Sequence, residues 1–173
     1  FRQDWRSEID ELRENLRQTN AVIISITSSD YPEQLKFISA PPPLLYVKGD
    51  LNNLHLPQIA IVGSRQMTRV GGTNARGWAK FLAGSGFTVT SGLALGVDGA
   101  AHQGALQAHN GRTVGVMATG IEAVYPARHR DLACQMLESG GTLVTEFHYG
   151  EKPIARHFPQ RNRIISGLSL GVL

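Results

Sequence analysis

Residues 59–92 read IAIVGSRQMTRVGGTNARGWAKFLAGSGFTVTSG, and the fold class can be inferred from their pattern. It opens with a continuous apolar run over 59–63, continues with a helical pattern over 68–82, and ends with a second strand over 86–92. Apolar strands that alternate with helices of about 10–15 residues are typical of a parallel sheet covered on both faces. The stretch therefore predicts a β-α-β unit with a right-handed crossover.

The same alternation continues to the end of the chain, and two further strands and a short helix are predicted before residue 59. Further strands are predicted over 21–27, in a run ending at Gly49, and over 113–120, 142–147 and 170–173. Further helices are predicted over 97–109, 128–137 and 161–168, with a short helix after Pro32. Together these elements predict an α/β protein with a mostly parallel sheet and helices on both faces.

The two ends of the chain differ from this pattern. Trp5, Ile9, Leu12 and Leu16 recur at helical spacing, which predicts an amphipathic helix over 4–17. The chain begins at Phe1 and stops inside an apolar run, so we expect a fragment of a longer protein. The expected organisation has two parts: a linker or remnant of a missing N-terminal domain over 1–20, and a main domain, truncated at its C-terminus, over 21–173.

Composition narrows the class of protein. With 42% apolar and 18% charged residues the chain has the composition of a soluble globular protein, and no apolar run approaches the ~20 residues that span a bilayer. A single cysteine, Cys134, excludes an internal disulfide framework, fits a reducing cytoplasm, and makes no convincing zinc site with scattered histidines. We expect a cytoplasmic protein with no membrane partner.

Charge is spread unevenly over the chain. Residues 36–173 hold thirteen lysines and arginines against seven acids, a surplus of +6, whereas the whole chain carries +3. A basic main body indicates a polyanionic partner.

In a parallel sheet the chemistry belongs where strands end and loops enter helices. Gly63, Ser64 and Arg65 follow the first strand of the quoted stretch, where backbone N–H groups at a helix start and an arginine fork could hold phosphate. The alternative is a tight turn with an exposed Arg65. The dinucleotide fingerprint Gly-x-Gly-x-x-Gly is absent because Gly63 is followed by Ser64, Arg65 and Gln66. We therefore disfavour a nicotinamide cofactor, and predict neither a cofactor nor a metal.

The next two loops carry weaker signals. Ser91 and Gly92 again follow a strand, and Asp98 and His102 stand four residues apart on one helical face. No nucleophile stands beside that pair, so we expect Asp98 to anchor the start of its helix. The basic cluster 128–130 is either a solvated helix start or a rim of the same groove.

The fourth loop, EFHYGEKPIARHFPQRNR over 146–163, is long, basic and aromatic. Basic residues interleaved with aromatic ones suit single-stranded nucleic acid, because phosphates take the charge and a base stacks on a ring. Two alternatives stay open: Phe158 is either a core residue or a stacking platform, and Arg163 either holds phosphate or pairs with Glu146.

Six blocks of the chain carry a resemblance to a known family. YPEQL, PPPLLYVKGD, IAIVGSR, SGLALGVDGAAHQGAL, GTLVTEF and FPQRNRIISGLSLGVL occur in that order. Together they resemble the DNA-processing protein A family, also called DprA or Smf, over about 22–173. The resemblance implies an extended Rossmann-like domain that binds single-stranded DNA without base preference. It also implies protection of incoming strands in natural transformation, loading of the RecA recombinase, a homodimer, and no enzymatic activity.

Carried over residue by residue, the resemblance places the phosphate-holding loop on Gly63, Ser64 and Arg65. It places the C-terminal binding segment on 156–163. With the second loop added, the predicted DNA- and phosphate-binding residues are Gly63, Ser64, Arg65, Ser91, Gly92, Arg156, Phe158, Arg161, Asn162 and Arg163.

A second resemblance gives an alternative of another class. The stretch GGTLVTE is similar to the Pro-Gly-Gly-x-Gly-Thr-x-x-Glu motif of nucleotide phosphoribohydrolases, although Glu138 and Ser139 precede it and the proline is missing. That enzyme would need a bound ribose beside Glu146. A scaffold that recruits recombinase without touching DNA fits poorly with basic loops gathered at one edge.

Overall fold

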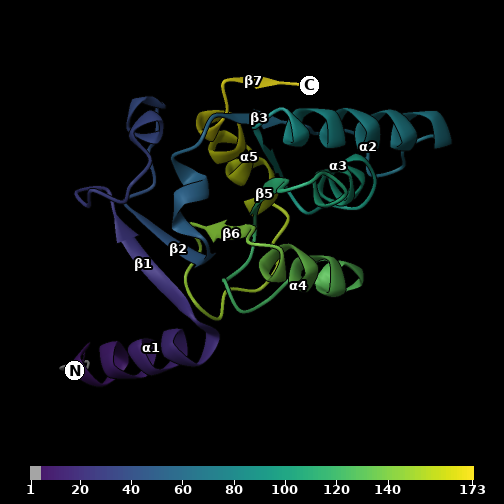
Figure 1. Ribbon diagram of the computed structural model, residues 1–173. Helices are drawn as coiled ribbons and strands as arrows, with labels where there is room; N and C mark the ends of the chain where they lie inside the picture. The colour runs from purple at the N-terminus through teal and green to yellow at the C-terminus, as the bar shows by residue number, and fades with distance from the viewer. Residues whose placement is uncertain (1–4) are drawn as a thin grey trace.

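The computed structural model describes residues 5–173; Phe1 and Asp4, on which the predictions for the N-terminal end drew, lie outside the described residues. A seven-stranded sheet with the order β1-β2-β6-β5-β4-β3-β7 forms the centre (Figure 1). The strands are β1 Ala21–Ser25, β2 Leu44–Gly49, β3 Gln58–Ala60, β4 Thr88–Ser91, β5 Arg112–Val116, β6 Thr142–Thr145 and β7 Gly171–Val172. β3 to β7 run parallel and the β1-β2 hairpin joins β6 antiparallel, which confirms the predicted mostly parallel α/β fold.

Within the parallel strands β3 to β7, the strand order reverses direction once. From β3 the chain steps outward through β4, β5 and β6, and then returns to place β7 on the free side of β3. Ile59 of β3 accordingly pairs with Val89 on one side and Gly171 on the other. Such a reversal opens a crevice at the carboxyl end of β3, the strand from which the chain departs in both directions, and open α/β sheets bind their ligands at such a point.

Helices cover both faces, as predicted. Three helices, α2 Arg69–Gly84, α3 Val97–Leu106 and α4 Arg130–Glu138, lie on one face, and α5 His157–Leu168 lies on the other (Figure 1). The short 3-10 helices η1 Glu33–Phe37 and η2 Leu51–Leu54 share the face of α5, and η3 Ala127–His129 leads into α4. None of the helices within residues 5–173 has the length and apolar character needed to cross a membrane.

Side chains of the central strands alternate between two cores because successive strand residues point to opposite faces. Val114 and Val144 pack with Ile164 and Leu168 of α5. On the other face Leu143 packs with Met136 of α4, and small alanines join α2 to α3. The N-terminal helix α1 Trp5–Thr19 adds its Leu16 to the core beneath α4.

Several boundaries differ from the predictions, among them those of three helices. α5 begins at His157, four residues before the expected start, because Pro159 sits in the first helical turn, where a missing N–H is tolerated. α3 ends at Leu106 rather than at 109, since the chain turns there toward Asn110 with its positive φ of 54°. α4 starts at Arg130 rather than at 128, because the 3-10 helix η3 takes up Ala127–His129. The first of these shifts brings Phe158 into a helix.

Candidate nucleic-acid interface

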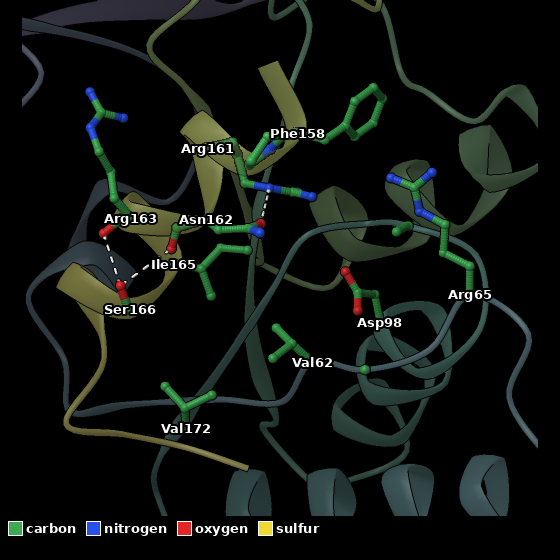
Figure 2. Close-up of a pocket in the computed structure, with 13 residues that line it drawn as sticks. Val62, Arg65, Asp98, Phe158, Arg161, Asn162, Arg163, Ile165, Ser166 and Val172 are labelled. Carbon is green, nitrogen blue, oxygen red and sulfur yellow. Dashed lines mark hydrogen bonds between the residues drawn. The ribbon is translucent and has the colours of Figure 1, made fainter. Parts of the chain in front are cut away.

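A cavity of about 690 Å³ lies at the carboxyl end of β3, between α5 and the first turn of α3 (Figure 2). Gly63 and Arg65 reach it from the loop after β3, Asp98 from α3, and Phe158 and Arg161 from α5. These five residues come from three separate loops and helices that the strand reversal brings together. The cavity therefore occupies the crevice that the sheet topology predicts.

Arg65 stands exposed at the rim of this cavity. Its guanidinium carbon lies 4.9 Å from the ring centroid of Phe158, a cation–π arrangement, and Tyr125 meets the same ring edge-on at 5.7 Å. None of the ion pairs in the described part of the chain includes Arg65. The charge of Arg65 is thus held in place by a ring but is not neutralised by a carboxylate.

The loop that carries Arg65 rests on the second loop. The backbone N–H of Val97 donates to the carbonyl of Ser64 at 3.2 Å, and the Ser64 hydroxyl accepts from the N–H of Gln66 at 3.1 Å. Gly96 has a φ of +83°, and a Cβ there would collide with the Ser64 carbonyl and come within 2.8 Å of the Arg65 Cα. The position of Arg65 consequently depends on a glycine in the neighbouring loop.

Arg161 lies beneath the cavity with only 4% of its surface exposed. Its Nη1 donates to the carbonyls of Gly92 and Val116, and its Nε donates to the Asn162 side chain at 3.2 Å. The guanidinium fills the space where a Cβ of residue 92 would stand, so a side chain at Gly92 would displace it. Ser91 is buried, and its hydroxyl donates to the Ile61 carbonyl at 2.6 Å. Neither Ser91 nor Gly92 lines the cavity: Gly92 holds the Arg161 guanidinium, and Ser91 ties the end of β4 to the residue that follows β3.

Asp98 supplies the carboxylate among the described residues that line the cavity. It is 5% exposed and accepts the Gly92 backbone N–H at 3.1 Å, which anchors the start of α3 as expected. Burial raises the pKa of Asp98, opposed by the charge of Arg161 and by backbone N–H groups. Burial lowers the pKa of Arg161 to about 10, opposed by Asp98 and reinforced by Arg65. Arg161 thus stays protonated at neutral pH, and two cations face one carboxylate.

Arg163 lines the wall but is already paired. Its two terminal nitrogens donate to the Glu146 carboxylate at 2.5 and 2.6 Å, and its Nε donates to the Ala40 carbonyl at 2.9 Å. Figure 2 shows its side chain pointing away from Arg65. This bidentate pair, the structural alternative considered above, fastens α5 to the end of β6. A phosphate contact by Arg163 stays a prediction.

The remaining residues singled out in the sequence differ in whether they line the cavity. Asn162 is exposed on the cavity wall, whereas Arg156 is exposed at the start of α5 and does not line the cavity. His102 is buried and bonds Thr113 at 2.7 Å, so it forms no acid–base pair with Asp98. Glu146 is held by Arg163 and lies outside the cavity, which leaves its carboxylate unavailable to a ribose.

The model of the family described as DNA recombination-mediator protein A matches residues 22–173. The chain belongs to this DprA/Smf family. Protein Smf of Escherichia coli is 47% identical over 158 residues, which are 91% of this chain and 42% of that protein. DNA processing protein DprA of Bacillus subtilis is 40% identical over 158 residues, 91% of this chain and 52% of that protein. The chain thus spans about half of the length of these DprA/Smf relatives.

Two solved DprA structures are similar. DprA of Streptococcus pneumoniae matches with a TM-score of 0.81 at 36% identity, over 92% of this chain and 56% of that chain. DprA of Helicobacter pylori, whose structure was described for its unique single-stranded DNA binding mode, matches with a TM-score of 0.78 at 28% identity, over 88% and 67%. The chain therefore has the Rossmann-like DprA fold.

The sequence did not reveal every part of this site. The apolar floor of the DprA cavity comes from Val62, Ile165 and Val172, and Tyr125 supports the Phe158 ring. Asp98 was expected only as a helix anchor, although its place in the second loop at the carboxyl edge was a signal that it would line the cavity. Tyr125 and Phe158 are far apart in the sequence, so no local sequence pattern predicts the contact between their rings.

Proposed function

We propose that the carboxyl edge of this sheet binds single-stranded DNA through its phosphates, without base preference, and that Phe158 stacks on a base. The observation that carries this proposal is the surplus of positive charge around the cavity. Arg65 and Arg161 face one buried carboxylate, and the free guanidinium of Arg65 lies against a partly exposed ring. A single-stranded polyanion with flat bases complements that combination. The binding mode described for the Helicobacter pylori relative supports it.

The predicted residues then take different parts. Arg65 and the backbone of Gly63 and Ser64 contact phosphate oxygens at the rim, with Asn162 on the wall and Arg156 at the start of α5 extending the contact. Arg161 acts from below as a fixed charge, because its hydrogen bonds to two carbonyls leave it little freedom. Gly92 positions Arg161, Ser91 fastens the strand end that carries Gly92, and the pair between Arg163 and Glu146 holds α5 in place.

The wider role belongs to the same proposal and rests on membership of the family. We infer a non-enzymatic cytoplasmic recombination mediator that protects incoming single strands in natural transformation and loads the RecA recombinase onto them. We further infer that it works as a homodimer, with residues 21–173 as the truncated DNA-binding domain and 1–20 as a linker. The family assignment of residues 22–173 supports this division of the chain.

Fluorescence anisotropy of labelled oligo-dT at three salt concentrations tests the binding site. Arg65→Ala should weaken binding by about 10- to 100-fold, because it removes a hydrogen-bonded charge of about 1.5–3 kcal/mol. The negative slope of log affinity against log salt should become shallower by about 0.7, the value of one lost phosphate contact on a single strand. The matched control is Arg17→Ala, which removes an exposed charge on α1. Unchanged affinity and slope in a folded Arg65→Ala protein would refute the proposed site.

A further inference from the structure

The aromatic surface at the rim of the cavity continues past the residues that line it. Phe158 lines the cavity, whereas Tyr125, whose ring centroid lies 5.7 Å from that of Phe158, does not. Tyr125 belongs to the loop after β5, and in the sheet β5 lies beyond β4, on the side of β3 opposite to β7. The ring of Tyr125 therefore extends the aromatic surface from the cavity toward the carboxyl end of β5.

Tyr125 is the more open of the two aromatic residues. It is 48% exposed, whereas Phe158 is only partly exposed and has the guanidinium of Arg65 over its ring at 4.9 Å. The Tyr125 hydroxyl takes part in none of the hydrogen bonds within residues 5–173. The contact with Phe158 thus occupies only part of the Tyr125 ring, and the rest of that ring is accessible to a ligand.

Hydrogen bonds on both sides of Tyr125 hold its segment in place. Before it, the carboxylate of Glu122 accepts the backbone N–H of Gly150 at 3.0 Å. After it, Nδ1 of His129 donates to the carbonyl of Leu93 at 2.8 Å. The segment is thereby fastened to the loop after β6 on one side and to the loop after β4 on the other. An aromatic ring on such a fastened segment can bind with little loss of conformational entropy.

The two rings differ in orientation. Their planes are inclined by 61°, and their centroids are close enough to serve neighbouring nucleotides. A base that stacks on Phe158 and a base that stacks on Tyr125 are inclined in the same way, because each lies parallel to its own ring. Neighbouring bases of a duplex stay parallel, at a spacing of about 3.4 Å per nucleotide along each strand. Only a single strand, whose bases can be unstacked and splayed apart, fits both rings.

We propose that Tyr125 is a second base-stacking residue, which takes the base next to the one on Phe158. The two inclined rings unstack these neighbouring bases and so select single-stranded over duplex DNA. The inference rests on the proposed function, because the strand must first be held by its phosphates at Arg65. It assigns a DNA contact to the loop after β5.

Photocross-linking tests this contact in the wild-type protein. Oligo-dT in which 5-iodouracil replaces thymine would be bound and irradiated, and the adducts would be located by mass spectrometry. We expect adducts at both Tyr125 and Phe158, because both rings lie against a base. Phe81 of α2, which is 72% exposed, is the control aromatic residue and should form none.

Affinity measurements test the selection of single strands. Tyr125→Ala should weaken binding of oligo-dT about 5-fold or more, which is the effect of one lost stacked base. Binding of the same oligo-dT paired with oligo-dA should stay unchanged, because a duplex contacts the protein through its phosphates alone. The ratio of the two affinities should therefore fall by the same factor. Tyr125→Phe is the matched control and should retain the wild-type ratio, since it keeps the ring.

A double-mutant cycle separates stacking by Tyr125 from mere support of Phe158. If Tyr125 acted only by holding the ring of Phe158, its removal would cost nothing in a protein that already carries Phe158→Ala. We expect instead that Phe158→Ala with Tyr125→Ala binds oligo-dT a further 5-fold or so more weakly than Phe158→Ala alone.

The outcomes separate this inference from the proposal on which it rests. Adducts at Phe158 but not at Tyr125, with no further loss in the double variant, overturn the role of Tyr125 and leave the proposed site intact. Equal losses for oligo-dT and for the duplex in Tyr125→Ala overturn the selection of single strands. Absence of oligo-dT binding by the wild-type protein at low salt overturns both the inference and the proposed function.

Discussion

At the amino end of the sheet, Arg112 lies beside a cavity of about 400 Å³ and donates to Asp50 at 3.2 Å and to Asn53 at 3.0 Å. At the carboxyl end, Arg65 lies beside a cavity of about 690 Å³. Its guanidinium lies against the ring of Phe158, and none of the ion pairs within residues 5–173 includes it. Each end thus has a hollow and an arginine, but the charge is balanced at one end and left in surplus at the other.

The polar groups at the amino end satisfy one another. Asn53 donates to the carbonyl of Gly140 at 2.7 Å and to the hydroxyl of Thr142 at 3.0 Å, and Thr142 in turn donates to the Asp50 carbonyl at 2.6 Å. Such a network stabilises the junction between η2 and β6 and leaves little charge for a ligand. The contrast teaches that an arginine beside a cavity indicates binding only when its charge is uncompensated.

Arg161→Met should give the largest effect, because it removes the fixed charge at the carboxyl end. The change leaves Asp98 buried without its cation and frees the carbonyls of Gly92 and Val116. We expect a loss of about 3–5 kcal/mol in the free energy of unfolding, measured by urea denaturation. Arg161→Lys keeps the charge and should lose less. A loss below about 1 kcal/mol for Arg161→Met would mean that the buried cation does not hold this end together.

Phe158→Ala should show that the carboxyl end binds by stacking as well as by charge. We expect affinity for oligo-dT to fall by about 1–3 kcal/mol, the contribution of one stacked base. The salt slope should stay as in the wild type, because a phenylalanine neutralises no phosphate. Phe158→Tyr, which retains an aromatic ring, is the control and should bind nearly normally. A slope that flattens in Phe158→Ala would mean instead that the ring acts mainly by holding Arg65 in place.

Mild acid should lower the free energy of unfolding through a buried histidine of α3, His102. Burial lowers the pKa of His102 to about 3, reinforced by the nearby charges of His129 and Arg161. The folded imidazole therefore stays neutral while the unfolded chain takes up a proton below about pH 6.5. Stability should accordingly fall as pH decreases from 6.5 toward 3, by about 2 kcal/mol between pH 7 and pH 5. Urea denaturation at both values measures this loss.

His102→Gln is the control for the acid effect, because an amide keeps polar contact with Thr113 but does not titrate in this range. Its stability should change less between pH 7 and pH 5 than that of the wild type. An equal change in both proteins would assign the acid sensitivity to other groups.

The sequence predicted the framework better than the details of charge. Apolar strands and helical spacing sufficed for the β-α-β pattern and placed the loops at the carboxyl edge. The depth of Arg161 could not be predicted, because a basic residue beside polar neighbours reads as exposed. Burial follows here from the space left by Gly92, 69 residues earlier in the chain. The start of α5 was predicted too late because of Pro159: a proline normally marks a helix boundary, but here it lies inside the first helical turn.

Arg112→Ala should have the smallest effect and gives the sharpest check on the difference between the two ends. Its pair with Asp50 is partly exposed, so the loss in free energy of unfolding should be about 0–1 kcal/mol. Affinity for oligo-dT and its salt slope should stay at wild-type values, although the variant loses the same charge as Arg65→Ala. If Arg112→Ala weakened binding as much as Arg65→Ala does, net charge rather than local geometry would govern DNA binding. Removing a cation at either end of the sheet would then weaken DNA binding equally, because a field that depends on net charge acts on the DNA wherever the cation stands.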